Sequence, residues 1–216
     1  MARHGAARNT AARRTAPVET NSLFEEFYQK QQVVGEDSWD EFMTVLQKPM
    51  PVVVRLNRTK PHWQELQVSF AMDVRWSELP WFPGAWRCDA KDYDDSLRSQ
   101  CSALNKSYAL RFQEAASLVP PLLLEVKSTD LLLDLCAAPG SKTLECIELM
   151  REESDSLEGV VIANDADAER CFELLPLITR KARHPGCAVV LGNGAKYPAQ
   201  FWGPGDQLLQ PGLVRG

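Results

Sequence analysis

Hydrophobic and polar positions follow two different periods along this chain, and each period predicts a different kind of element. Between Leu23 and Leu46 the apolar residues recur at helical spacing, which predicts an amphipathic helix that Gly35 interrupts and a second helix that Ser38 could cap. Val52–Leu56 is a β-branched run and predicts a strand. Gln113–Leu124 predicts a further helix, which Pro120-Pro121 breaks or kinks. Asp89–Asn105 is polar, and we interpret it as a linker or loop.

Beyond residue 130 the predicted strands and helices alternate. Short apolar runs predict strands at Leu131–Leu135, Val160–Ala163 and Ala188–Leu191. Helices are predicted between them at Ser141–Met150 and Asp167–Lys181, the second with a proline that kinks or stops it. This order is typical of a parallel, doubly wound sheet, so the predicted fold class is α/β.

The composition limits the class of protein and the ligands it can bind. The chain has 216 residues, of which 44% are hydrophobic and 25% are charged, as in ordinary globular proteins. Its net charge of -5 repels phosphate, so a nucleic-acid binder of this composition must concentrate positive charge locally. The six cysteines have no C-x-x-C spacing, which favours buried thiols over disulfides or a zinc site. No apolar run is long enough to span a bilayer.

Two segments allow more than one interpretation. Met1–Pro17 is rich in alanine and arginine and has no acid. We interpret it as a disordered, solvated tail; the alternatives are a nuclear-localising or RNA-contacting arm and a mitochondrial presequence. The tryptophans Trp76, Trp81 and Trp86 either fill a core or stack on RNA bases.

The most specific chemical signal is the string LLLDLCAAPGSKT at Leu131–Thr143. A buried strand, a tight loop of small residues and a helix start follow one another, as in α/β proteins that bind nucleotide-like ligands. Pro139 stiffens the turn. The string is not a phosphate-binding P-loop, because Ser141 separates glycine from lysine and Leu135 stands where the first glycine belongs.

This string closely resembles motif I of the RNA (cytosine-5) methyltransferases, the Fmu/Sun-domain family, where it holds S-adenosylmethionine. Other blocks resemble the eukaryotic nuclear tRNA (cytosine-5) methyltransferases in order and spacing: Leu23–Met43, Pro51–Asn57, Gln113–Leu124 and Val161–Asp165. The resemblance implies a partial Rossmann-like class I methyltransferase sheet preceded by a small N-terminal α/β RNA-contacting domain. The implied parts are an RNA-contacting domain (21–112) and a partial methyltransferase domain (113–200). Composition adds a basic disordered tail (1–20) and, because residues 201–216 resemble nothing in the family and are rich in glycine and proline, an unstructured end (201–216).

The resemblance also implies a cofactor site made by the loops after three successive strands. Lys142 lines the methionine and ribose side, Asp134 orders the first loop, and Asp165 accepts hydrogen bonds from the ribose hydroxyls. Asn193 stands where the family has an aspartate that accepts the adenine amino group. Because an amide is uncharged, we predict cofactor binding weaker by about 1 kcal/mol. The expected cofactor-binding residues are Cys136, Ala137, Ala138, Pro139, Gly140, Ser141, Lys142, Asp165 and Asn193.

By the same resemblance, the end of the strand Val52–Leu56 faces RNA through Arg55, Asn57, Arg58 and Lys60. The alternative is a solvated strand end. The expected partner is RNA, above all tRNA, and we expect no membrane, no metal and a monomer. The expected location is the nucleus, with the mitochondrion or cytoplasm as alternatives.

Methylation of cytosine at C5 needs a cysteine thiolate that adds at C6. The family supplies it from a Thr-Cys motif and adds a second cysteine from a Pro-Cys motif, and neither dipeptide occurs here. We therefore interpret the chain as truncated, with no catalytic residue and no activity by itself. Two alternatives are a non-catalytic short form that binds RNA or cofactor, and a small-molecule methyltransferase; the N-terminal family blocks argue against the second.

Overall fold

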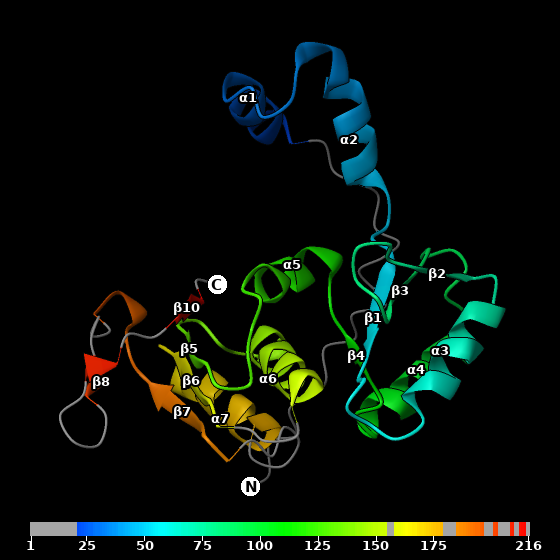
Figure 1. Ribbon diagram of the computed structural model, residues 1–216. Helices are drawn as coiled ribbons and strands as arrows, with labels where there is room; N and C mark the ends of the chain where they lie inside the picture. The colour runs from blue at the N-terminus through cyan, green and yellow to red at the C-terminus, as the bar shows by residue number, and fades with distance from the viewer. Residues whose placement is uncertain are drawn as a thin grey trace, which may run out of the picture. The chain divides into compact units, whose positions relative to one another are not determined.

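The computed structural model describes residues 21–154, 158–178 and 185–196, and the backbone of three short strands beyond them. The chain divides into two compact units, Met1–Pro51 and Val52–Gly216 (Figure 1). The predicted tail at 1–20 and the last residues of the predicted helix Asp167–Lys181 lie outside the described residues.

The first unit is a pair of helices with a single 3-10 turn between them. Asn21 caps the first helix, since its side chain accepts a hydrogen bond from the Phe24 N–H at 3.1 Å. Aromatic rings pair along each helix, Phe24 with Tyr28 and Trp39 with Phe42. Neither helix has a fully buried residue, and these four aromatic side chains are half-buried. The elements are α1 (Ser22–Lys30), η2 (Glu36–Ser38) and α2 (Trp39–Gln47).

The second unit begins with an antiparallel sheet in the order β2-β3-β1-β4. In β1, one of the two inner strands, Val54 lies opposite Trp86 of β3 on one side and Phe112 of β4 on the other. Trp76 and Trp86 are buried in the core of this sheet, which confirms the core interpretation for both. The elements are β1 (Val52–Leu56), α3 (Trp63–Met72), β2 (Trp76–Glu78), β3 (Ala85–Cys88), α4 (Asp95–Lys106) and β4 (Leu110–Phe112).

The polar stretch Asp89–Asn105, predicted as a loop, contains α4, and that prediction was wrong. Asp94 caps this helix by accepting a hydrogen bond from the Leu97 N–H at 2.8 Å. Leu97 and Cys101 are buried on its inner face, four residues apart, so a narrow apolar stripe is enough to dock it. Strand β4 was also not predicted.

The helix predicted at Gln113–Leu124 is α5 (Ala115–Leu123), and it continues through Pro120 and Pro121 instead of breaking there. It buries Leu118 and Pro121. Helix α5 leads from the antiparallel sheet into the second sheet of this unit, whose first helix it contacts.

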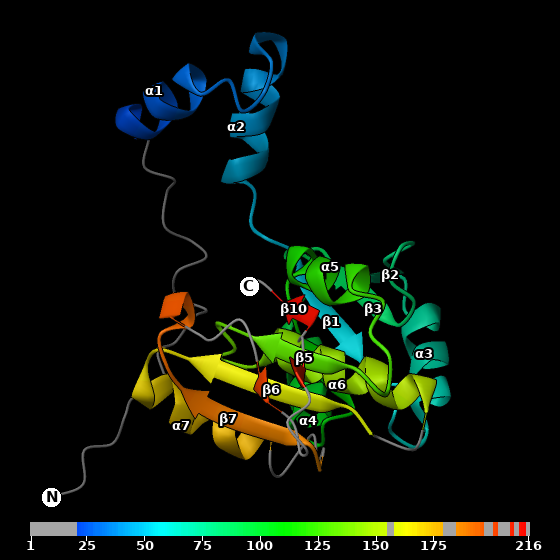
Figure 2. The ribbon, with the colours of Figure 1, turned by 60° about the vertical axis from the view of Figure 1, so that its left-hand side comes forward.

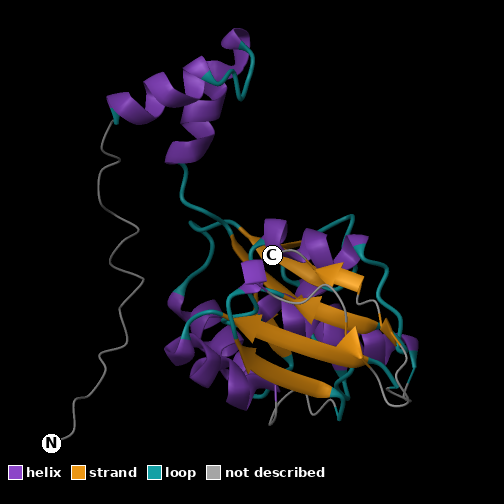
Figure 3. Ribbon diagram, turned by 90° about the vertical axis from the view of Figure 1, so that its left-hand side faces the viewer, coloured by secondary structure: helices purple, strands orange, loops and turns teal. Residues whose placement is uncertain are grey.

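The second sheet is parallel in the described strands, in the order β10-β5-β6-β7 (Figure 2). Helices α6 and α7 share one core cluster with β5 and β6, to which Leu132, Ile147 and Leu174 belong, and helices lie behind the strands in Figure 3. The α/β class and the Rossmann-like sheet are confirmed. The elements are β5 (Leu131–Asp134), α6 (Ser141–Glu153), β6 (Val160–Asp165), α7 (Ala168–Pro176) and β7 (Cys187–Leu191).

The expectation of an unstructured end at 201–216 needs correction for the residues that the structure describes. Strand β8 (Phe201–Trp202) pairs with β9 (Leu208–Leu209), and β10 (Gly212–Val214) joins β5 in parallel. The free edge of β5 has backbone N–H and C=O groups that a further strand satisfies. This pairing outweighs the glycine and proline content on which the expectation was based.

Candidate functional site

The loop between β5 and α6 is fixed at both ends by Asp134. One carboxylate oxygen accepts from the Cys136 N–H at 3.3 Å, and the other accepts from the Thr143 hydroxyl at 2.6 Å. Burial raises the pKa of Asp134, and the hydrogen bond from Thr143 opposes that rise. The prediction that Asp134 orders the first loop is confirmed.

Gly140 turns this loop into α6. Its φ of +101° lies in the left-handed region, and an added Cβ would lie 2.5 Å from Leu177 Cδ2 and 2.6 Å from Leu174 Cδ1. No side chain caps the start of α6, so the N–H groups of its first turn keep donor capacity for a ligand. Ala137 and Ala138 are buried, whereas Cys136 and Pro139 are exposed at the loop surface.

Asp165 at the end of β6 holds the same loop from the other side. One carboxylate oxygen accepts from the Ala138 N–H at 3.1 Å, and the other accepts from the Asp167 N–H at 3.1 Å. The Arg170 guanidinium lies 3.7 Å from the carboxylate and donates to the Ala138 carbonyl. The structure therefore brings the first loop and Asp165 together, as the sequence predicts.

Asn164 joins the first and third loops, a role that the sequence analysis missed. Its buried side-chain amide donates to the carbonyls of Leu135 and Gly192, each at 2.9 Å. Its backbone carbonyl accepts from the Ala137 N–H at 2.8 Å. A Cβ on Gly192 would lie 2.9 Å from Asn164 Oδ1, so glycine lets the third loop approach. An amide inside an otherwise apolar strand was the available signal, because buried polar groups need partners.

Asn193 lies exposed in the third loop, beside the short 3-10 turn η4 (Gly194–Lys196). Its side-chain oxygen accepts from the Ala195 N–H at 3.0 Å. A Cβ on Gly194 would lie 3.3 Å from the Leu135 carbonyl oxygen, which places the third loop against the first. All three predicted loops thus meet at one edge of the parallel sheet.

Arg55 and Asn57 do not face solvent, so the expectation that they contact RNA is corrected. Arg55 is 3% exposed; its guanidinium pairs with Glu148 of α6 and donates to Gln113 Oε1 at 3.3 Å. Asn57 is 5% exposed, and its Oδ1 accepts from the Thr59 N–H at 3.1 Å and the Thr59 hydroxyl at 2.6 Å. The strand end packs on α6, and this burial directs both side chains inward.

Glu145 of α6 completes this buried network. The side-chain amide nitrogen of Gln113 donates to the Glu145 carboxylate and also to the Ser117 carbonyl. Burial raises the pKa of Glu145 to about 7, against the attraction of Arg55. The nearby carboxylates, Glu148 first, keep Arg55 charged by raising its pKa despite its burial. The network fastens β1 to α6.

Arg58 and Lys60 are half-buried and belong to different surroundings. Arg58 pairs with Glu152 at 3.3 Å and lies over the Trp63 ring at 5.3 Å. Lys60 lines a narrow cleft of about 20 Å³ together with Arg111 of β4 and Arg151 of α6. The sequence analysis missed both arginines, since they come from elements far apart along the chain.

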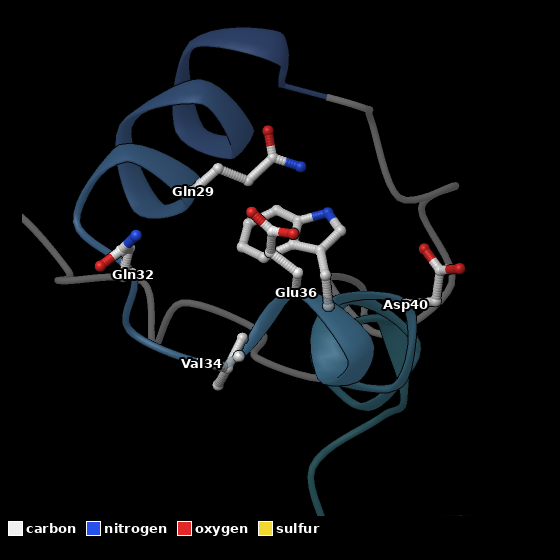
Figure 4. A pocket seen from close by; sticks show the side chains of 7 residues that line it. Gln29, Gln32, Val34, Glu36 and Asp40 are labelled. Atoms are coloured by element: carbon white, nitrogen blue, oxygen red, sulfur yellow. The ribbon is translucent and has the colours of Figure 1, made fainter.

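A separate groove of about 780 Å³ lies within the first unit (Figure 4). Gln29 from α1 and Glu36 from η2 reach into the same space, and Asp40 flanks it. Acidic residues outnumber basic ones over residues 21–51, and carboxylates repel RNA phosphates. Within the predicted RNA-contacting domain, the positive charge therefore lies after Pro51.

Four cysteines, the buried Cys88, Cys101 and Cys146 and the partly buried Cys187, are poor nucleophiles, and burial raises the pKa of each, Cys88 included. Burial raises the pKa of Cys101 to about 11 and that of Cys146 to about 12, and it raises the pKa of Cys187 to about 12. No group of three His, Cys, Asp or Glu suited to a metal ion occurs in the described part of the chain. The helices described there also include none that is long and apolar enough to cross a membrane.

Known proteins resemble this chain in sequence. Residues 121–204 match the family model of the 16S rRNA methyltransferase RsmB/F. The multisite-specific tRNA:(cytosine-C(5))-methyltransferase of Saccharomyces cerevisiae is 32% identical over 187 residues, covering 76% of this chain and 27% of the yeast protein. The tRNA (cytosine(49)-C(5))-methyltransferase of Pyrococcus abyssi is 32% identical over 145 residues, covering 67% of this chain and 44% of that protein. The chain thus spans less than half the length of these relatives.

Solved structures show the same fold. The crystal structure of NSun6 from Pyrococcus horikoshii with SFG has a TM-score of 0.59 at 16% identity, covering 78% of this chain and 64% of that chain. The methyltransferase homolog protein from the same organism has a TM-score of 0.57 at 22% identity, covering 80% and 53%. At these identities the likeness concerns the fold alone, which is that of Rossmann-like methyltransferases.

Proposed function

Because this chain belongs to the RNA (cytosine-5) methyltransferase family of the Fmu/Sun-domain type, we propose that it binds S-adenosylmethionine at the edge where its three loops meet. The observation that carries the proposal is the first loop, held by Asp134 and Asp165 beside the uncapped start of α6. Such a helix start suits the carboxylate of the methionine end.

The residues present fit the other parts of this cofactor. Asp165 is only 3% exposed, and each of its oxygens already accepts one backbone N–H. A carboxylate oxygen has two lone pairs, so in this proposal the remaining lone pairs of Asp165 would accept from the ribose hydroxyls. Asn193 supplies an amide oxygen for the adenine amino group. Lys142 and the loop Cys136–Ser141 line the methionine and ribose side in this proposal.

We further propose that the family reaction transfers the methyl group to C5 of a cytosine in RNA, above all tRNA, with the base turned out of its stack. Residues 21–112 would contribute the RNA contact and residues 113–200 the cofactor. The 216-residue chain has neither the Thr-Cys nor the Pro-Cys dipeptide, and burial raises the pKa of four of its cysteines, Cys88, Cys101, Cys146 and Cys187. We therefore propose that this chain alone binds cofactor and RNA without turnover. That it is a monomer and is located in the nucleus are further proposals, which rest on its resemblance to the eukaryotic nuclear tRNA (cytosine-5) methyltransferases.

Equilibrium dialysis with labelled S-adenosylmethionine tests the cofactor site. Asp165→Asn is expected to weaken binding at least tenfold, because the charged acceptor is lost and the loop is loosened. Asp92→Asn, at an exposed position away from the site, is the matched control. Absence of binding by the wild-type chain overturns the proposal.

Turnover is measured separately, by nucleoside mass spectrometry of tRNA incubated with chain and cofactor. The expected result is no 5-methylcytosine. Its formation would show that one of the cysteines present acts as nucleophile, and the non-catalytic proposal would fall. Fluorescent tagging of the chain in eukaryotic cells tests the nuclear location.

A further inference from the structure

The narrow cleft beside α6 gathers cations that the cofactor site does not use. Lys60 reaches it from the turn after β1, Arg111 from β4 and Arg151 from α6. We propose that this cleft binds a phosphate of the RNA backbone, an inference that rests on RNA being the partner in the proposed function. It keeps Lys60 and replaces Arg55 as the RNA-contacting element; Asn57, whose amide oxygen already accepts from Thr59, contributes only to the wall of the cleft.

The charge in the cleft is unbalanced. Apart from Arg151, its lining includes two cations, Lys60 and Arg111, and one carboxylate, Glu148, which already pairs with Arg55. Among the described residues, neither Lys60 nor Arg111 has a carboxylate within 4.0 Å. An anion entering the cleft therefore meets two cationic donors that form no ion pair within the described chain.

Arg111 is the strongest indication that the cleft is built for an anion. It is half-buried, its guanidinium lies over the Tyr108 ring at 5.5 Å, and its burial lowers its pKa. A desolvated cation without an ion pair is unfavourable, and a bound anion would offset that cost. A guanidinium also presents paired donors that match phosphate oxygens.

The size of the cleft selects phosphate over a base. About 20 Å³ holds roughly one water-sized atom, which admits a phosphate oxygen but excludes a nucleobase. The remaining phosphate oxygens would lie at the mouth, within reach of the flexible Lys60 ammonium group. The cleft is therefore expected to contribute affinity without sequence preference.

The cleft also lies along the helix that carries the cofactor loop. Ser141 begins α6 at that loop and Arg151 lies in its last turn, which separates the two by roughly 15 Å along the helix axis at 1.5 Å per residue. A strand anchored by its backbone at the cleft can extend along α6 to the edge where the methyl donor is proposed to bind.

The test compares Lys60→Gln and Arg111→Gln with Lys91→Gln, a lysine exposed elsewhere on the same unit. Affinity for tRNA is measured by fluorescence anisotropy between 50 and 200 mM salt. Each cleft variant is expected to bind about fivefold to tenfold more weakly at 0.1 M salt, with the salt slope reduced by about 1. Lys91→Gln is expected to stay within twofold of wild type. Because Lys60 is half-buried and lies outside the strands of the sheet, its variant tests the cleft even if Arg111→Gln fails to fold.

Two further measurements separate the possible results. Inorganic phosphate binding is followed by isothermal titration, and weakened phosphate binding with unchanged tRNA binding would mean that the cleft takes a free anion, overturning the RNA assignment. Cofactor dialysis on the same samples isolates the proposed function. Wild-type protein that binds cofactor but no tRNA refutes both the RNA partner and the cleft. Cleft variants that bind tRNA like Lys91→Gln refute the cleft alone.

Discussion

Replacing Arg55 with methionine tests whether the buried ion pair fastens β1 to α6. The Arg55 and Glu148 side chains are 4% and 9% exposed, so removing the guanidinium leaves a buried carboxylate without its partner. Removing one member of such a pair costs about 3–5 kcal/mol. Against a typical unfolding free energy of about 5–15 kcal/mol, Arg55→Met is expected to leave the second unit marginally stable.

Urea denaturation followed by tryptophan fluorescence measures this loss, since Trp86 lies buried in the same sheet. The double variant Arg55→Met/Glu148→Met removes both charges and is expected to return to within about 1 kcal/mol of wild type, because apolar side chains of similar volume replace a buried pair well. Arg58→Met is the matched control. Its pair with Glu152 is partly exposed and is expected to contribute less than about 1 kcal/mol.

A different result would refute this reasoning. If Arg55→Met unfolds at the wild-type urea concentration but binds tRNA several-fold more weakly, then Arg55 faces RNA and the buried pair has no structural role. If the double variant is no more stable than Arg55→Met, the guanidinium stabilises through something other than Glu148.

Three further substitutions probe the cofactor edge and its support. Gly140→Ala adds a Cβ at a left-handed backbone, where two side-chain atoms would lie within 3 Å of it, and it is expected to lower the free energy of unfolding by about 2–4 kcal/mol. The control Gly35→Ala has open space around the new Cβ and is expected to change this free energy by less than about 0.5 kcal/mol. Equal urea midpoints for the two variants would contradict this. Because the folded pKa of Glu145 is raised from 4.5 to about 7, the unfolded chain releases this proton first, so wild-type stability is expected to fall as pH rises from about 4.5 to 7. Glu145→Gln is expected to remove that part of the slope, and identical pH profiles of the two proteins would show that Glu145 does not titrate in this window. Asn193→Asp is expected to tighten S-adenosylmethionine binding about fivefold through a charged acceptor, and an unchanged dissociation constant by dialysis would count against that site.

The sequence predicted the parallel sheet and its first loop because their signals are local. A short apolar run, an acid and a turn of small residues lie within Leu131–Thr143, and the structure realises them as β5, a loop and α6. Asp165 was found for the same reason, as the polar residue that ends an apolar strand.

The surroundings of β1 could not be predicted in this way. Whether Arg55 faces solvent depends on Glu148, which belongs to a helix far along the chain, and no local pattern records that packing. Helix α4 was missed for a different reason. Asp94 is a typical N-cap residue and could have indicated a helix start, but the prediction followed the polar composition of the segment instead. The pairing of β10 with β5 likewise joins distant segments.

The bridge made by Asn164 has a consequence for binding entropy. One amide fixes the spacing between the Leu135 and Gly192 carbonyls, and with it the gap between the first and third loops. A ligand that spans both loops meets a preorganised site, so little of its interaction energy is spent on ordering them. Engineering that lengthens either loop alone would give up this advantage, even if every atom that touches the ligand were kept.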